Sequence, residues 1–370
     1  GRAAVRTVAR YDSGPDSLGG ILSVYRQASD GSFAAPESYR FGAYPWRMAI
    51  ADVDGDGAPD IVVTDVGRGS IEGATWLLLQ DAASRGRFLA AQRLPQSGPG
   101  ASASYDPVVA DVDGDGVPDI VGGALAGGTG ARVMIQDPSR RGTFQPWAPL
   151  DVPGSATGIA AGDLDGDGRG DLAFWTVIGR EDYAPVGSLA WRLRQPDGTL
   201  GPAQTALRTV GVNERRMAML DIDGDARTDV LVFLRPSAVE YTGKLTSVIQ
   251  GPAGAMTPID TSVGSPGNDD AAFGDLDGDG RVDVAMVGWW MSGTSTQGLL
   301  TFYTQTGGGA FSGRSRIDVS MIDMPGHVAV GDLDGDGRLD AVVLGHQAQP
   351  WLVRQSHAAP GTFEPPRPLR

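Results

Sequence analysis

The sequence predicts an all-β protein, a seven-bladed β-propeller of four-stranded antiparallel blades, and three observations support that fold. An acidic nine-residue motif begins at six places that lie 52 to 59 residues apart, a spacing that suits a blade of four strands. A glutamine that closes an apolar, β-prone segment recurs seven times, and each time a Gly-x-apolar triplet follows. The 55 Gly and 25 Pro indicate many turns and short elements.

Each full repeat contains the same expected elements in the same order. A short alternating strand such as residues 47–51 leads into the acidic loop, and a β-rich segment such as residues 60–65 follows it. After a variable loop come a third strand that ends in the glutamine, a tight turn and a Gly-led fourth strand. The expected glutamines are Gln27, Gln80, Gln136, Gln195, Gln250, Gln305 and Gln355.

A single propeller domain is expected over residues 1–370. Its full blades are expected at residues 46–104, 105–156, 157–214, 215–268, 269–325 and 326–370. Residues 1–45 carry the glutamine and the triplet without an acidic loop, so they predict an incomplete N-terminal blade that starts at its second strand. Closure of the ring then needs a first strand from outside this sequence, or one blade has three strands, and the sequence leaves both possibilities open.

The acidic motif predicts a binding site for Ca²⁺. Two carboxylates about 4 Å apart repel by roughly 4 kcal/mol at an effective dielectric constant near 20, so four of them in nine residues require a cation. Side chains at positions 1, 3 and 5 of such a loop converge, the carbonyl oxygen of position 7 joins them, and position 9 closes the shell with both oxygens. Hard Ca²⁺ prefers this set of oxygens, whereas Mg²⁺ resists such dehydration. The expected ligands of up to six ions are Asp52, Asp54, Asp56, Ala58 and Asp60; Asp111, Asp113, Asp115, Val117 and Asp119; Asp163, Asp165, Asp167, Arg169 and Asp171; Asp221, Asp223, Asp225, Arg227 and Asp229; Asp275, Asp277, Asp279, Arg281 and Asp283; and Asp332, Asp334, Asp336, Arg338 and Asp340.

Position 6 of each loop is expected to adopt the left-handed backbone conformation that aims position 7 inward. Five loops carry Gly there, whereas the fourth loop carries Ala226. Forcing Ala into this conformation costs about 1–2 kcal/mol. We therefore expect the fourth site to bind Ca²⁺ most weakly.

Two other interpretations of the motif are weaker. A single aspartate-rich loop is often a solvated turn, but six copies in register argue against that reading. An EF-hand needs a Glu at position 12 and flanking helices, and both are missing here.

Charge and composition exclude several classes of partner. The formal net charge of −15 argues against nucleic acids and anionic membranes, which need a basic surface. The longest apolar segment, around residues 284–291, is far shorter than the roughly 20 residues needed to span a bilayer. No Cys is present, so disulfides, thiolate metal sites and a cysteine nucleophile are excluded.

The repeats resemble the FG-GAP or VCBS family, the calcium-binding blades of the integrin α-subunit head and of many secreted bacterial proteins. The segments VAVGDLDGDGRLDAVVLG (328–345) and AAFGDLDGDGRVDVAMVG (271–288) carry the resemblance, which spans six full units and a partial seventh. It implies a seven-bladed propeller with calcium in the hairpin between the first two strands of a blade. It implies no shared ligand, because members of the family serve as adhesion heads, lectins, toxin components and appendages of hydrolases.

A ligand site is expected at the ends of the first strands opposite the acidic loops. Charged residues recur five positions before the first Asp of a loop, and an aromatic pair lies in a loop on the same side. A mixed charged ring with an exposed aromatic pair would suit a polar ligand, although charged residues that only solvate this side explain the pattern too. The candidate ligand-binding residues are Arg47, Asp106, Arg216, Asp270, His327, Trp289 and Trp290.

These features favour a calcium-stabilised recognition or adhesion module, secreted or on the cell surface of a bacterium, that binds a carbohydrate or a protein. Extracellular modules tolerate weak calcium sites of about 10⁻⁴–10⁻³ M because calcium is plentiful there. The chain is expected to be monomeric or part of a larger protein. No catalytic residues are assigned, because the three His are accompanied by neither a nucleophile motif nor a zinc-ligand cluster. The alternatives are a polysaccharide lyase or glycosidase and a structural appendage of a larger secreted enzyme.

Overall fold

The protein is built from antiparallel β-strands. The computed structural model describes residues 3–6, 20–28, 32–68, 71–96, 106–123, 130–181, 184–236, 243–251, 254–263, 268–345 and 349–369. Within these ranges no helix is long and apolar enough to cross a membrane. The chain divides into two compact units, one of residues 1–28, 34–181 and 186–209, the other of residues 29–33, 182–185 and 210–370.

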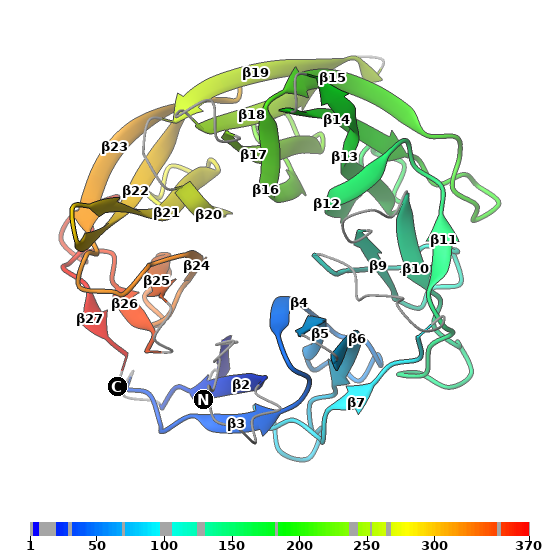
Figure 1. The fold of residues 1–370 in the computed structure, drawn as a ribbon, viewed down its shortest axis with the longest axis horizontal. Coiled ribbons are helices and arrows are strands. Elements are labelled where there is room, and N and C mark those ends of the chain that lie inside the picture. Colours follow the sequence, from blue (N-terminus) through cyan, green and yellow to red (C-terminus); the bar gives the residue numbers. More distant parts are fainter. Residues whose placement is uncertain are drawn as a thin grey trace. The chain divides into compact units, whose positions relative to one another are not determined.

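The first unit contains one three-stranded and three four-stranded sheets, and in each of them neighbouring strands pair in chain order (Figure 1). The three-stranded sheet consists of β1 (Ala3–Arg6), β2 (Ile21–Arg26) and β3 (Glu37–Arg40). The four-stranded sheets are β4 (Pro45–Ala51), β5 (Asp60–Arg68), β6 (Ile71–Leu78) and β7 (Gln92–Arg93); β8 (Val108–Ala110), β9 (Asp119–Gly123), β10 (Ala131–Met134) and β11 (Ala148–Leu150); and β12 (Ser155–Gly162), β13 (Asp171–Glu181), β14 (Ala184–Arg192) and β15 (Gln204–Val210).

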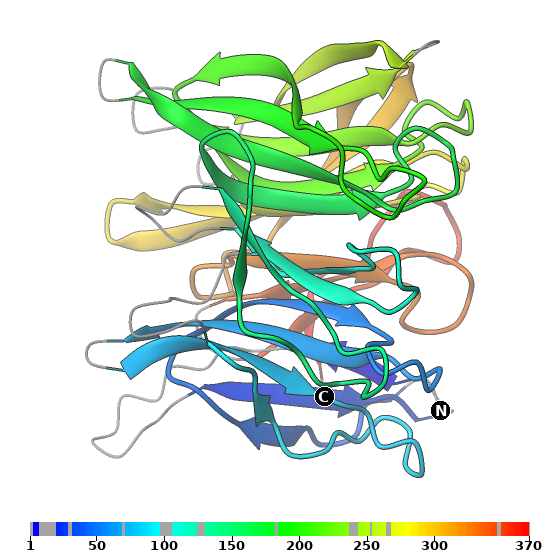
Figure 2. The same ribbon diagram turned by 90° about the vertical axis from the view of Figure 1, so that its right-hand side faces the viewer.

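The second unit contains three four-stranded sheets with the same order of strands. The longest hairpin of the chain, β21–β22, belongs to its middle sheet (Figure 2). The three sheets are β16 (Val212–Leu220), β17 (Asp229–Pro236), β18 (Gly243–Gln250) and β19 (Met256–Val263); β20 (Asn268–Gly274), β21 (Asp283–Ser292), β22 (Ser295–Gly307) and β23 (Ala310–Asp318); and β24 (His327–Gly331), β25 (Asp340–Leu344), β26 (Trp351–Val353) and β27 (Arg367–Pro368).

The fold is a β-propeller of four-stranded antiparallel blades, and the described residues form six such blades, not seven. The predicted seventh blade is the sheet β1–β2–β3, which has three strands. Among the described strands β1 pairs with β2 alone, so its other edge carries no first strand. Residues 7–19 of this expected incomplete blade lie outside the described residues.

The hydrophobic core lies between neighbouring blades of each unit. The second strands are buried on both faces, as in residues 61–65 and 283–288, because a blade is covered by sheets on two sides. Leu77 of one blade and Met134 of the next share one core cluster, and Phe233 and Met286 share another. This burial of both faces explains why the second strands read as continuous apolar runs.

Each acidic loop joins the first strand of a blade to the second and is anchored in this core by its second residue. Val53 and Ile222 illustrate the pattern, since both are almost fully buried in the cluster between their own blade and a neighbour. The loop is therefore held by an apolar contact on one side of its charged turn. Burying one such aliphatic side chain contributes about 1.5–3 kcal/mol.

In three blades the repeat glutamine joins the blade to the preceding one. Gln136 donates from Nε2 to the carbonyl oxygen of Val53 in the previous acidic loop (3.1 Å), and its Oε1 accepts from the amide of Gly142 in its own turn. Gln305 and Gln355 donate in the same way to the carbonyl oxygens at position 2 of the preceding loops. The recurrence of this residue is thus explained by a bond between blades.

The prediction that Gln195 occupies the repeat glutamine position is wrong. Arg194, not Gln195, forms the isolated bridge to the fourth strand and donates its backbone amide to Asp171, as the glutamines do to the corresponding Asp of their own loops. The distance along the chain to the turn glycine is a signal for this register. It is four or six residues from the other glutamines of the full repeats and only three from Gln195, whereas Arg194 restores four.

Replacing Gln136 by Ala is expected to destabilise the protein by about 1–3 kcal/mol, because it leaves the amide of Gly142 and the carbonyl of Val53 buried without their partner. Chemical denaturation monitored by circular dichroism measures the change. The control is Gln204→Ala, which removes an exposed glutamine in β15 and should change the free energy of unfolding little. Equal losses in both variants would contradict the inter-blade role.

Candidate metal-binding loops and the opposite strand ends

The six acidic loops share one backbone conformation, which the first aspartate holds. Asp52 accepts the amide of Gly55 at Oδ1 (2.7 Å) and the amide of Gly57 at Oδ2 (3.0 Å). The corresponding aspartates of the other five loops accept the same two amides. Positions 4 and 6 have positive φ in every loop, as expected for a turn that folds back on its own carboxylate.

In four of these turns three of the predicted carboxylates come together. In the first, second and fourth loops one carboxylate oxygen from each of positions 1, 3 and 5 lies within 4.8 Å of the others, as with Asp52, Asp54 and Asp56. In the third loop the group consists of positions 1, 3 and 9. Three converging carboxylates are hard oxygen donors, and this donor set fits Ca²⁺. Their negative charge would balance the charge of the ion without thiolate or amine ligands. The assignment of all thirty ligands remains a prediction.

The aspartate at position 9 is the most buried member of each loop, and its environment goes beyond the prediction that it would be a bidentate ligand. Asp60 accepts the amide of Val53 at Oδ2 (2.8 Å) and the amide of Gln80, at the end of the third strand, at Oδ1 (2.7 Å). The other five loops repeat both bonds. This carboxylate therefore ties the loop to the third strand, and only its remaining lone pairs are available to a metal.

Burial in this position changes the protonation of the carboxyl group. Desolvation raises the pKa of Asp119, Asp283 and Asp340 to about 6, and the neighbouring loop carboxylates add to the rise, while the backbone amides oppose it. The pKa values of Asp60 and Asp229 are raised for the same first cause. Below about pH 6 a metal-free loop thus holds protons that a bound cation would displace.

In the presence of a chelator the protein is expected to melt at a higher temperature at pH 5 than at pH 7. Because the folded-state pKa values near 6 exceed the ordinary value of 3.8, the folded protein binds more protons than the unfolded chain between these values. The stability from those protons is present at low pH and is lost as the pH rises through about 6.

The dependence on pH should reverse when calcium is added. Calcium affinity, measured by titration calorimetry, is expected to fall between pH 7 and pH 5 because protons compete for the same carboxylates. A metal-free protein that melts higher at pH 7 than at pH 5, or a calcium affinity independent of pH over this range, would contradict the assignment.

The fourth loop differs at position 6, as the sequence predicts. Ala226 has φ of 65°, the left-handed conformation that glycine adopts at the same position of the other loops with φ between 81° and 89°. Its amide still donates to Asp221 (2.9 Å), so the loop keeps the common conformation at the expense of backbone strain.

Ala226→Gly is expected to stabilise the protein by about 1 kcal/mol and to strengthen calcium binding at the fourth loop, because glycine adopts this φ without a steric penalty. The melting temperature with calcium and with chelator measures both effects. The matched control is Gly337→Ala, which introduces the same strain into the sixth loop and should act in the opposite direction.

At the opposite ends of the first strands, four blades carry a β-bulge at the same position. The register of the first and second strands shifts around Trp46, Thr157, Arg215 and Asp269, each six residues before the first Asp of its loop. Bulges redirect side chains and are common beside binding sites. Three of the predicted ligand residues, Arg47, Arg216 and Asp270, directly follow a bulge, but the sequence does not reveal the bulge itself.

In the first unit this end of β4 presents two aromatic rings to solvent. Tyr44 and Trp46 stack with ring centroids 5.9 Å apart and an angle of 25° between the rings, and they are 37% and 39% exposed. Beside them Arg47 Nε pairs with Asp106 Oδ1 of the next blade (2.9 Å), so the structure brings together two of the predicted residues. Tyr44 was not predicted, because a lone Tyr ahead of a strand carries no sequence signal.

A buried carboxylate supports this aromatic pair. Asp65 of β5 accepts the amides of Ala43 (2.6 Å), Tyr44 (2.9 Å) and Gly67 (2.7 Å) and is 1% exposed. These bonds fix the backbone that leads from Phe41 into β4. The exposed rings are therefore held by a rigid segment.

The second unit holds the other predicted ligand residues. His327 Nδ1 lies 3.6 Å from Oδ2 of the buried Asp270, and Arg235 pairs with Asp269 (2.7 Å). Arg216 is half-buried in β16, and no described ion pair joins it to these groups. Trp289 and Trp290 are half-buried in β21 opposite Gly298 and Gln297 of β22 rather than lying in a loop, so they form part of the long hairpin.

The comparisons with known families agree with the acidic loops. The profile of the FG-GAP-like repeat matches residues 8–63, 52–122 and 275–343, which include the loops at 52–60, 111–119 and 275–283 and that at 332–340. These segments are FG-GAP-like repeats. The resemblance expected from the sequence is thereby confirmed for the repeats and for their propeller fold. No curated protein matches the chain in sequence.

Several solved structures are similar to this chain at low sequence identity. A polysaccharide lyase of family PL25, an ulvan lyase bound to a saccharide of GlcA and Rha3S, has a TM-score of 0.53 and 10% identity over 96% of this chain and 93% of its own. A second structure of the PL25 ulvan lyase has a TM-score of 0.45 and 9% identity over 97% and 94%. The N11 neuraminidase-like protein of a flat-faced bat H18N11 isolate has a TM-score of 0.44 and 9% identity over 94% and 92%.

Proposed function

We propose that the FG-GAP-like blades form a calcium-stabilised recognition module that binds a carbohydrate at the bulged end of β4. The observation that carries this proposal is the exposed, stacked pair of Tyr44 and Trp46 beside the ion pair of Arg47 and Asp106. Contiguous exposed apolar patches often mark binding sites, and Tyr and Trp combine an apolar face with a polar edge.

The chemistry of this patch suits a sugar ring. The aromatic faces offer apolar area to the C–H groups of a pyranose, while Arg47 offers donors and Asp106 offers acceptors to its hydroxyl groups. Arg47 and Asp106 keep 12% and 20% of their side-chain surface exposed, so they are held in place and still reach a ligand. Because Asp65 fixes the backbone at Tyr44, little conformational entropy is lost on binding.

Calcium and location belong to the same proposal. Six acidic loops, four of which bring three carboxylates together, would hold up to six Ca²⁺ ions and remove most of the charge of −15. Because extracellular calcium saturates even weak sites, we propose that the module is secreted or displayed on the cell surface. Its ligand in that setting is a glycan or polysaccharide.

An enzyme acting on polysaccharides is the second candidate. The buried Asp270 beside the exposed His327 has the arrangement of a carboxylate that orients a general base. The fold likeness to an ulvan lyase at a TM-score of 0.53 is compatible with this chemistry, although it extends to the fold alone. Asp270 also accepts the amide of Val328 (3.3 Å), which offers a structural reason for its burial.

Trp46→Ala and Tyr44→Ala are each expected to weaken carbohydrate binding at least about tenfold, because each removes one of the stacked rings. A glycan array identifies the ligand, and titration calorimetry with that glycan measures the loss. Leu89→Ala, which removes a 52% exposed apolar side chain elsewhere in the same unit, is the control and should bind normally.

The same preparations distinguish the alternatives. If the protein cleaves a polysaccharide and the His327→Ala variant does not, the protein is an enzyme rather than a recognition module. Absence of both glycan binding and cleavage would leave the structural appendage as the remaining interpretation.

A further inference from the structure

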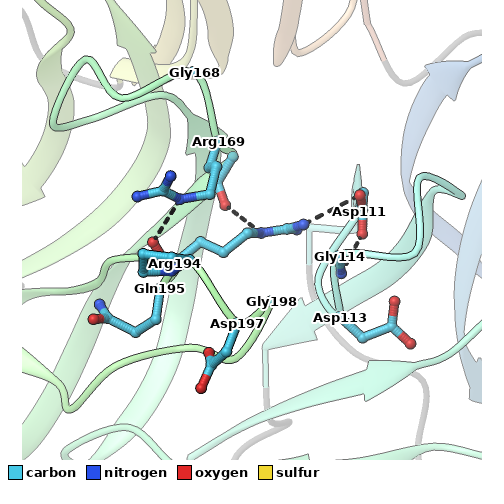
Figure 3. A pocket seen from close by; sticks show the side chains of 11 residues that line it. Asp111, Asp113, Gly114, Gly168, Arg169, Arg194, Gln195, Asp197 and Gly198 are labelled. Atoms are coloured by element: carbon cyan, nitrogen blue, oxygen red, sulfur yellow. Dashed lines mark hydrogen bonds and ion pairs between the residues drawn. The ribbon is translucent and has the colours of Figure 1, made fainter.

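One blade departs from the glutamine rule described above, and the replacement brings a charge to an acidic loop. Where Gln136 binds a neutral carbonyl of the first loop, Arg194 directs its guanidinium into the second loop (Figure 3). We propose that Arg194 is the resident cation of the loop formed by residues 111–119, so that this loop keeps its fold without calcium and binds calcium more weakly than the loop at 52–60. The inference rests on the calcium binding proposed above.

The contacts of Arg194 place its charge at a predicted metal ligand. Nη1 lies 3.1 Å from Oδ2 of Asp111, the aspartate at position 1, while Nε donates to the carbonyl oxygen of Gly170 in its own blade (3.2 Å). Asp111 Oδ2 also accepts the amide of Gly116 (3.1 Å). A metal ion that used this oxygen would therefore share it with a guanidinium, and the two positive charges would repel each other.

The guanidinium is held where water screens it poorly. Only 6% of the Arg194 side chain is exposed, and Nη2 is buried without a hydrogen-bond partner among the described residues. A pocket of about 480 Å³ lies beside the second loop and the turn at residues 195–198, and Arg194 and Asp111 line it. A buried charge needs a paired opposite charge, and Asp111 is the carboxylate that meets this need.

Close backbone packing keeps the two loops together. A Cβ added to Gly114 would lie 2.9 Å from Cα of Gly198, and one added to Gly198 would lie 2.7 Å from the carbonyl oxygen of Asp113. Both positions tolerate only glycine, so the turn that follows Arg194 is fixed against the second loop. The arginine therefore has little room to withdraw when a metal ion approaches.

The first loop provides the comparison within the same unit. Its neighbour from the next blade is the neutral Gln136, which binds the carbonyl of Val53 and leaves the carboxylates of the loop free. Arg141 lies near Gly55 at this loop, but it is exposed, so solvent and salt screen its effect on Asp54. The buried positive charge distinguishes the second loop from the first.

A reciprocal exchange tests the inference. Arg194→Gln gives the second loop the residue that the other full blades carry and is expected to raise the calcium affinity of one site by roughly tenfold or more. In chelator the same variant should melt below the wild type, because Asp111 loses its cation. Gln136→Arg should weaken one calcium site, and Arg194→Lys, which keeps the charge, should leave calcium binding low.

The site of the change is identified by removing a ligand. Equilibrium dialysis and titration calorimetry with calcium alone count the sites, and Asp113→Asn in the Arg194→Gln background should abolish the gained affinity. Unchanged calcium binding in Arg194→Gln, or an equal gain in Arg194→Lys, would overturn the inference. A wild-type protein that binds no calcium would instead refute the calcium proposal itself, which separates the two failures.

Discussion

The buried aspartate at position 9 of each acidic loop is the interaction on which the rest of the blade depends. Its two oxygens accept one amide from the loop and one from the end of the third strand, so a single carboxylate joins three segments of chain, as Asp60 does with Val53 and Gln80. Because the group is desolvated, its charge must be compensated by these amides and by whatever cation the outer carboxylates attract. The same group thus links the fold of a blade to the state of its loop.

The glutamine that follows this aspartate extends the linkage to the neighbouring blade. Its backbone amide binds its own loop and its side chain binds the preceding one, as with Gln355 at Asp340 and Leu276. One residue therefore contacts the acidic loops of two neighbouring blades. Arg194 shows that this position also tolerates a charged residue, in which case the link runs to a carboxylate instead of a carbonyl.

The repeat could be predicted from the sequence because each of its marks has a local physical cause. Acidic residues at alternate positions, glycine at left-handed positions and apolar second strands are set by the loop and strand themselves, and even the left-handed Ala226 follows from spacing. The number of complete blades, the bulges and the place of Trp289 within strand β21 could not be predicted in this way, because they depend on pairing between strands. Arg194 could not be predicted at the repeat position because the other repeats carry Gln there and Gln195 is the next residue. Only a difference of one residue in the distance to the turn glycine indicates the correct position.

The recurring bulge has a consequence for how such a module diversifies. It leaves one residue of the first strand, such as Trp46 or Asp269, outside the ladder whose register leads to the acidic loop. The bulged end of the first strand is thus separated from the end that leads to the acidic loop. New specificities can arise at one end by ordinary point mutation while the scaffold inherited at the other end stays intact.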